Sequence, residues 1–181
     1  MGAKLLRHDI ASRPATDTSA KRFEADFPAI VKACRQVAEY AESYGITTSI
    51  ENHGFFLQAA ERVQRVIEAV GRDNFKTTLD VGNFLCVDED PLVSVQNNLP
   101  YASMVHFKDF YVREADRSPG EGWFQSTFGR YLRGAIVGHG DIPIPEVVKQ
   151  VKQSGYDGYI SIEFEGMEDC KKRLENRDGK R

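Results

Sequence analysis

The sequence is short of several features that would assign it to a specialised class of protein. Its three cysteines, Cys34, Cys86 and Cys170, stand far apart without a CxxC pair, so it contains neither a zinc-knuckle nor a redox motif. No apolar run approaches the roughly 18 residues of a membrane span, and the first residues lack the long apolar stretch of a signal peptide. We therefore expect a reduced, cytoplasmic protein that does not enter a membrane.

An excess of charge of one sign is also absent. The formal net charge is −3, whereas proteins that bind nucleic acid usually present a strongly basic face. We therefore expect no nucleic-acid partner. With 181 residues, 41% hydrophobic and 28% charged, the chain is long enough to bury a core, and we expect a single domain over residues 1–181.

Helical and strand patterns alternate along the chain. Apolar residues at spacings of three and four predict amphipathic helices over residues 23–44 and 59–70. A glycine ends each helix, and a short strand rich in β-branched residues follows. The first of these strands ends at Glu51 and the second ends at Asp80.

The alternation continues over the rest of the chain and predicts about six strands with five or six helices. Further strands are expected at residues 3–10, 102–110, 134–142 and 159–166, and further helices at residues 91–98, 144–154 and 167–177. Residues 111–134 show no clean periodicity and are expected to form a long functional loop. This alternation indicates a parallel sheet with right-handed crossovers, either an open doubly wound sheet or a closed barrel.

Four potential metal ligands stand at or near the ends of predicted strands: Glu51, Asp80, His106 and Glu163. They are 29, 26 and 57 residues apart, which we interpret as one, one and two strand-helix units. One such residue is ordinarily a solvated loop residue or a cap, but four in phase with the repeat favour a shared site. Strand ends converge at the mouth of a barrel, whereas an open sheet spreads them along an edge. The spacing therefore favours a barrel.

The chemistry of these four side chains suits one divalent cation. Carboxylates with one imidazole form a mostly oxygen site, for which manganese is our first choice and magnesium, cobalt or zinc are alternatives. A cation would also allow Glu51 and Glu163 to stay ionised near each other.

The chain resembles the sugar phosphate isomerase/epimerase branch of the xylose-isomerase-like TIM-barrel superfamily, which includes ketose 3-epimerases and inosose-processing enzymes. The resemblance extends over nearly the whole chain and rests on five segments in order: SIENHG, TLDVGNF, VHFKDF, GHGDI and GYDGYISIEFEG. It implies a metal-dependent isomerase or epimerase that acts on a small sugar, a sugar phosphate or a cyclic polyol. By this resemblance Glu51, Asp80, His106 and Glu163 hold the metal. Glu51 and Glu163 also move protons next to a carbonyl through an enediolate-type intermediate.

Five further residues are candidates for substrate binding: His53, Asn83, Lys108, Arg113 and His139. Some family members have a histidine where this chain has Asn83, and an amide can bind a sugar hydroxyl but cannot titrate near neutrality. A solvated surface charge is the favoured alternative for Lys108 and Arg113. An ordinary loop residue is the alternative for His53.

A complete barrel of this type has eight strand-helix units, and the sequence shows about six, as if the first two were missing. Such a chain leaves strand edges open. We therefore expect a homo-oligomer, or self-pairing through the strand around residues 5–10. The alternatives for function are an inosose-type dehydratase and a non-catalytic remnant that binds a sugar or a partner. An abasic-site endonuclease has less support, because it needs more histidines than this chain's four.

Overall fold

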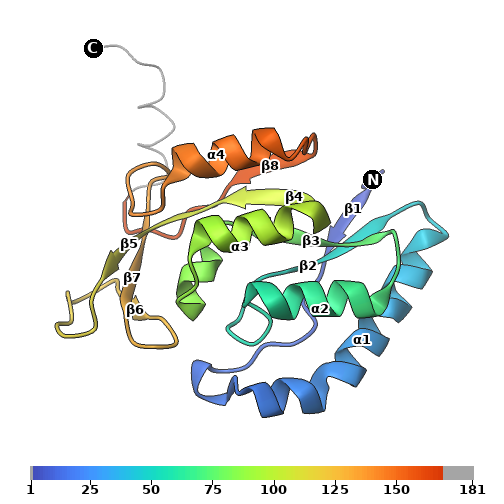
Figure 1. Ribbon diagram of the computed structural model, residues 1–181, viewed down its shortest axis with the longest axis horizontal. Helices are drawn as coiled ribbons and strands as arrows, with labels where there is room; N and C mark the ends of the chain where they lie inside the picture. Colours follow the sequence, from blue (N-terminus) through green and yellow to red (C-terminus); the bar gives the residue numbers. More distant parts are fainter. Residues whose placement is uncertain (1, 169–181) are drawn as a thin grey trace.

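The computed structural model describes residues 2–168 (Figure 1). The main sheet has five parallel strands in the order β1-β2-β3-β4-β8, namely β1 (Leu5–Arg7), β2 (Thr47–Glu51), β3 (Phe75–Asp80), β4 (Ala102–Phe107) and β8 (Tyr159–Ile162). The described helices are α1 (Ala20–Glu42), α2 (Ala60–Val70), α3 (Pro91–Asn98) and α4 (Ile144–Gln153), with short 3-10 turns η1 (Ala15–Asp17), η2 (Asn83–Val87) and η3 (Leu99–Tyr101). The helix expected at residues 167–177 lies almost entirely outside the described residues.

Local sequence signals begin and end the helices. The Ser19 hydroxyl accepts a hydrogen bond from the Arg22 amide at the start of α1, and the Asp90 carboxylate caps the start of α3 in the same way. Gly71 ends α2 in the left-handed conformation at φ 61°, and its amide donates to the Ile67 carbonyl. The helix and strand alternation that the sequence predicts up to α3 is confirmed.

The helices pack side by side in chain order, α1 on α2, α2 on α3 and α3 on α4. They cover the sheet face on which Ile50, Leu79 and Val105 are buried. Since side chains alternate between the two faces of a strand, the residues that follow these three in sequence point to the opposite face. The result is a curled half-barrel, which confirms the prediction of an incomplete TIM-type barrel.

The predicted strand at residues 134–142 is wrong. β8 pairs directly with β4, with His106 opposite Ser161, so the described chain contains five barrel strands and not six. The gap of 57 residues between His106 and Glu163 therefore spans neighbouring strands and not two units. Within the predicted segment only Gly134 and Ala135 are in a strand, and turns and bends follow.

The predicted loop at residues 111–134 includes parts of a small antiparallel sheet with the strand order β5-β7-β6, joined by turns and irregular segments. Its strands are β5 (Asp109–Arg113), β6 (Phe124–Gln125) and β7 (Tyr131–Ala135). Phe110 and Leu132 from this sheet are fully buried in the core between the main sheet, α3 and α4. The pairing of β5 with β7 joins segments distant in sequence, so no local periodicity revealed it.

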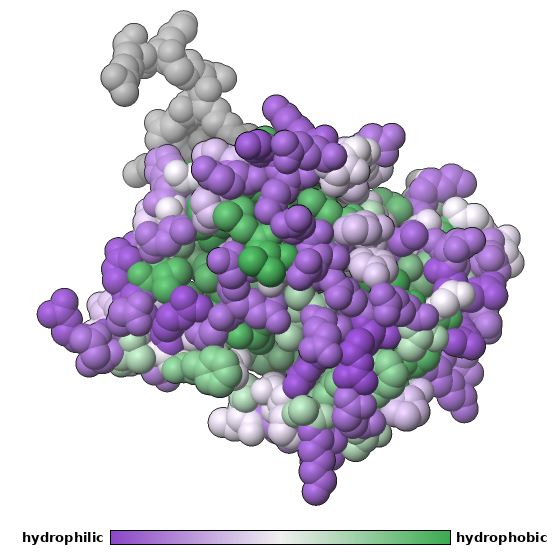
Figure 2. Space-filling model, in the orientation of Figure 1, coloured by the Kyte–Doolittle hydropathy of each residue, from purple (hydrophilic) through white to green (hydrophobic). Residues whose placement is uncertain are grey.

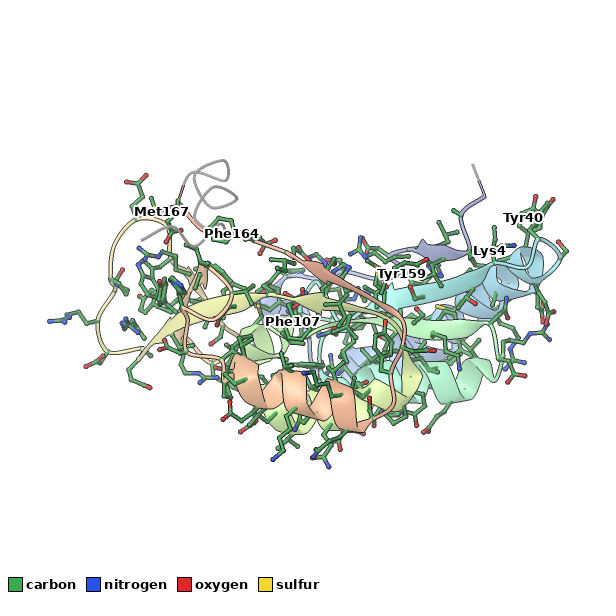
Figure 3. All side chains as sticks on the ribbon, turned by 90° about the horizontal axis from the view of Figure 1, so that it is seen from above. Lys4, Tyr40, Phe107, Tyr159, Phe164 and Met167 are labelled. Carbon is green, nitrogen blue, oxygen red and sulfur yellow. The ribbon has the colours of Figure 1, made fainter. Side chains whose placement is uncertain are left out.

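The two edge strands carry exposed apolar side chains. On β8, Tyr159 is 72% exposed and Ile160 is 54% exposed, and on β1 Leu6 is 48% exposed. Seen from above, α2, α3 and α4 lie along one side of the strands, and none of the described helices covers β8 at Tyr159 (Figure 3). The surface over the helices is mostly hydrophilic with separate apolar patches (Figure 2). Among the described helices, none has the length and apolar character to cross a membrane.

Candidate metal centre

The four predicted metal ligands lie together at the carboxyl ends of their strands. Glu51 ends β2, Asp80 ends β3, His106 is near the end of β4, and Glu163 directly follows β8. Asp80 pairs in register with His106 across the sheet. One ligand atom from each of the four residues lies within 4.8 Å of the other three.

Asp80 is the most buried member of this cluster, with no exposed surface. Its Oδ1 atom accepts hydrogen bonds from the amides of Gly82 and Asn83, both at 2.8 Å. Its Oδ2 atom is buried and accepts no hydrogen bond from any described residue. Burial raises the pKa of Asp80 to about 7, against the opposing effect of the Lys108 ammonium. A buried carboxylate oxygen without a donor is suited to a cation, so the residues present fit a divalent metal.

Glu51 is held from two sides. The Arg7 Nε atom lies 2.6 Å from Glu51 Oε2, and the Asn83 amide donates to Glu51 Oε1 at 3.2 Å. Because Glu51 is 7% exposed, its charge needs such partners. These two contacts hold the Glu51 carboxylate close to the other ligands.

His106 and Glu163 form a pair, with Nδ1 of the ring 3.1 Å from Oε2 of the carboxylate. This hydrogen bond raises the pKa of His106 despite the opposing effect of burial. The same bond is the main cause that lowers the pKa of Glu163 to about 2. The pair therefore holds the imidazole ring and the Glu163 carboxylate side by side at the mouth of the sheet.

Lys108 corrects the surface interpretation made from the sequence. Its side chain is buried, and its Nζ atom lies 3.0 Å from Glu163 Oε1 and 3.5 Å from Asp80 Oδ2. Burial lowers its pKa, but the neighbouring carboxylates outweigh burial and the pKa is raised. Lys108 is therefore an ammonium inside the cluster.

The other predicted substrate-binding residues are distributed differently. Asn83 is buried within the cluster, where its amide oxygen accepts from Lys108 at 3.2 Å. His53 is exposed and, with Glu51, lines a cavity of about 10 Å³, the size of one water. Arg113 is exposed and pairs with Asp141 at 3.2 Å. This agrees with the alternative that Arg113 is a solvated surface charge. His139 is exposed in the turn after β7.

Two positioning residues were missed from the sequence. The Asn52 side chain donates to the Asp80 carbonyl and accepts from the Asp80 amide, at 2.8 and 2.9 Å, which fixes β3 against β2 at the centre. Arg7 stands at the end of β1, opposite Ser49 on β2. The carboxyl ends of all the parallel strands lie at the same edge of the sheet, so the position of Arg7 at the end of the first strand could have predicted it at this site.

Asp109 is a third residue that the sequence did not single out. Its buried carboxylate accepts hydrogen bonds from the amides of Gly138 and Gly140, both at 2.9 Å, and from the Ile142 amide at 3.2 Å. A Cβ atom at Gly140 would collide with this carboxylate. The GHGDI segment is therefore a loop wrapped around Asp109 and not a barrel strand.

Comparison with known proteins agrees with this geometry. The sequence model of the family described as "Xylose isomerase-like TIM barrel" matches residues 1–179. The chain belongs to this family. Among curated relatives, the inosose dehydratase of Lacticaseibacillus casei is 23% identical over 137 residues, which cover 72% of this chain and 44% of that protein.

Solved structures of the xylose isomerase-like family share the fold. A xylose isomerase-like TIM barrel protein from Mycobacterium smegmatis in complex with magnesium aligns with a TM-score of 0.70 at 19% identity, over 98% of this chain and 60% of that one. A D-tagatose 3-epimerase-like protein aligns with a TM-score of 0.67 at 20% identity, over 96% and 60%. The chain thus spans about half the length of the curated relative and about three fifths of these structures.

Proposed function

We propose that this chain is a divalent-metal-dependent isomerase or epimerase that transfers a proton next to the carbonyl of a small sugar, a sugar phosphate or a cyclic polyol. The observation that carries the proposal is the cluster of Glu51, Asp80, His106 and Glu163, with ligand atoms within 4.8 Å of one another. The buried Asp80 oxygen without a hydrogen-bond donor supports a cation there. The fold shared with a D-tagatose 3-epimerase-like protein supports the reaction class.

In this proposal Glu51 and Glu163 are the acid/base pair as well as metal ligands. One carboxylate removes the proton next to the carbonyl, and the other delivers a proton to the resulting enediolate-type intermediate. Arg7 and Asn83 orient Glu51, and His106 orients Glu163. A divalent cation, with manganese as our first choice and magnesium, cobalt or zinc as alternatives, would polarise the substrate oxygens.

The five candidate substrate-binding residues differ in how exposed they are and in whether they contact the ligand cluster. We propose His53 as a direct substrate-binding residue, because it is exposed beside Glu51. Asn83 and Lys108 would position the metal-ligand side chains, and they would contact only the part of the substrate that lies at the metal centre. Arg113 and His139, both exposed, would act at the rim of the mouth.

An inosose-type dehydratase is the second candidate, and the name of the Lacticaseibacillus casei relative favours it. The same carboxylates would remove a proton and then assist the loss of a hydroxyl group as water. The two reactions share their first step, so they differ in product and not in the residues that begin them.

One assay of the purified chain separates these functions. The chain is loaded with Mn²⁺ and incubated in D₂O with ketohexoses, ketose phosphates and inososes, and the products are read by NMR and mass spectrometry. A product that carries deuterium at one carbon and has otherwise the same mass as the substrate supports the isomerase or epimerase. Loss of water supports the dehydratase. Sugar binding without turnover by the metal-loaded chain would indicate a non-catalytic remnant. A separate incubation with an abasic-site duplex tests the endonuclease, which would cleave it.

We further propose a single cytosolic domain that pairs with a second copy through its open sheet edge. The outer edge of β1 has no neighbouring strand among the described residues, and an unpaired edge is a template for another strand. The chain should therefore scatter light as a dimer, and Leu6→Lys on β1 should shift it to the 20.4 kDa monomer. Val93→Lys on α3, also at an exposed apolar residue, is the control. A wild-type monomer would refute the pairing.

A further inference from the structure

Lys108 has a position that the proposed proton transfer does not require. Its side chain is 2% exposed, which is rare for a lysine unless its charge is paired. Four oxygens lie within 3.5 Å of its Nζ atom: Asp80 Oδ2, Glu163 Oε1, Glu165 Oε2 and Asn83 Oδ1. Two of these four oxygens belong to proposed metal ligands.

The stem of the Lys108 side chain packs closely against Gly82. A Cβ atom on Gly82 would come within 3.0 Å of the Cβ and Cγ atoms of Lys108. A side chain at position 82 would crowd the lysine stem at this distance, so one of the two would have to shift. Gly82 therefore contacts both residues: its amide donates to Asp80 Oδ1, and its Cα side packs against the stem of Lys108.

We propose that Lys108 is a built-in cation that holds the donor carboxylates in place before a divalent metal binds, and that it then limits how tightly the metal is held. This inference rests on the metal centre proposed above. Without a cation, Glu51, Asp80 and Glu163 would repel one another at the distances observed. A divalent ion that shares Asp80 and Glu163 with Lys108 would lie close to the ammonium and be repelled by it.

The test is Lys108→Met, which keeps the length of the side chain and removes its charge. In chelator-treated protein, we expect the melting temperature to fall by about 10 °C, because the buried Asp80 carboxylate and the Glu163 carboxylate lose the ammonium that lies near both. Addition of Mn²⁺ should restore it. Calorimetric titration should show Mn²⁺ bound about tenfold more tightly than by the wild type. Lys76→Met, at a half-buried lysine of β3 outside the cluster, should change neither value appreciably.

A double variant separates charge from packing. If the carboxylates repel one another in Lys108→Met, then adding Glu163→Gln should recover part of the lost melting temperature in metal-free protein. The same comparison applies if Lys108→Met cannot be purified without metal: a soluble double variant supports the proposal, and an equally insoluble one contradicts it. No recovery would mean that the lysine matters only for packing.

Two further results would overturn the proposal: an unchanged melting temperature of metal-free Lys108→Met, or weaker Mn²⁺ binding by that variant. The failure of the proposed function looks different. A wild-type chain that binds no Mn²⁺ refutes the metal centre, whereas the metal-free melting temperatures still decide whether Lys108 holds the carboxylates together. None of these measurements requires turnover.

Discussion

Asp80→Ala is expected to abolish stoichiometric binding of a divalent cation. Asp80 supplies the buried Oδ2 atom that accepts no hydrogen bond from a described residue, and Asp80 is the most buried of the four proposed ligands. The substitution removes one of three negative charges from the centre and one of four ligands. Metal analysis after dialysis against Mn²⁺, together with calorimetric titration, would measure the loss.

Two variants make this result specific. Asp80→Asn keeps an oxygen that can accept from the Gly82 and Asn83 amides, so the fold should survive while binding weakens strongly. Asp90→Ala removes the exposed cap of α3, which should cost about 1 kcal/mol of stability and leave metal content unchanged. Full metal occupancy in Asp80→Ala would remove this residue from the site.

Glu51→Gln and Glu163→Gln are each expected to slow exchange of the substrate's carbon-bound hydrogen with solvent by about a hundredfold or more. An amide cannot accept the proton, and positioned general acid/base groups typically contribute about 10²–10⁴-fold to the rate. An amide also binds a cation more weakly than a carboxylate does. Exchange in D₂O at saturating Mn²⁺ separates the loss of proton transfer from the loss of metal.

Glu165→Gln is the matched control for these variants. Glu165 contacts Lys108 at 3.4 Å but is largely exposed and lies outside the ligand set. Its substitution should reduce the rate far less than substitution of Glu163. If exchange continued undiminished in Glu51→Gln, the proton would have to move through another group, and the acid/base assignment would be wrong.

The main elements were predictable because their signals are local. Gly71 ends α2 within one turn of the last apolar residue, and the β-branched residues before Glu51 and Asp80 mark their strands without reference to distant partners. Glu51, Asp80 and His106 followed from their phase with this repeat. Glu163 was correctly expected at a strand end, but the two-unit spacing inferred for it was wrong, because β8 pairs directly with β4.

The remaining features depend on contacts that no local pattern encodes. β5 pairs with β7 across a long connection, and Arg113 opposite Tyr131 is one such pair. Lys108 is buried in close contact with Gly82 and beside carboxylates at the ends of two other strands, from Asp80 and Glu163. A lysine two residues after a strand-end histidine is ordinarily solvated, so its sequence position alone gave the wrong expectation.

Because β4 pairs directly with β8, residues 111–135 are an insertion between two neighbouring strands. Because His106 and Glu163 belong to neighbouring strands, their separation does not depend on the length or shape of the chain between them. Asp109 fastens the start of that chain to Gly138, Gly140 and Ile142 near its return. A replacement for the insertion would therefore leave the two ligand strands adjacent, provided that it supplied an apolar side chain where Leu132 is buried in the core.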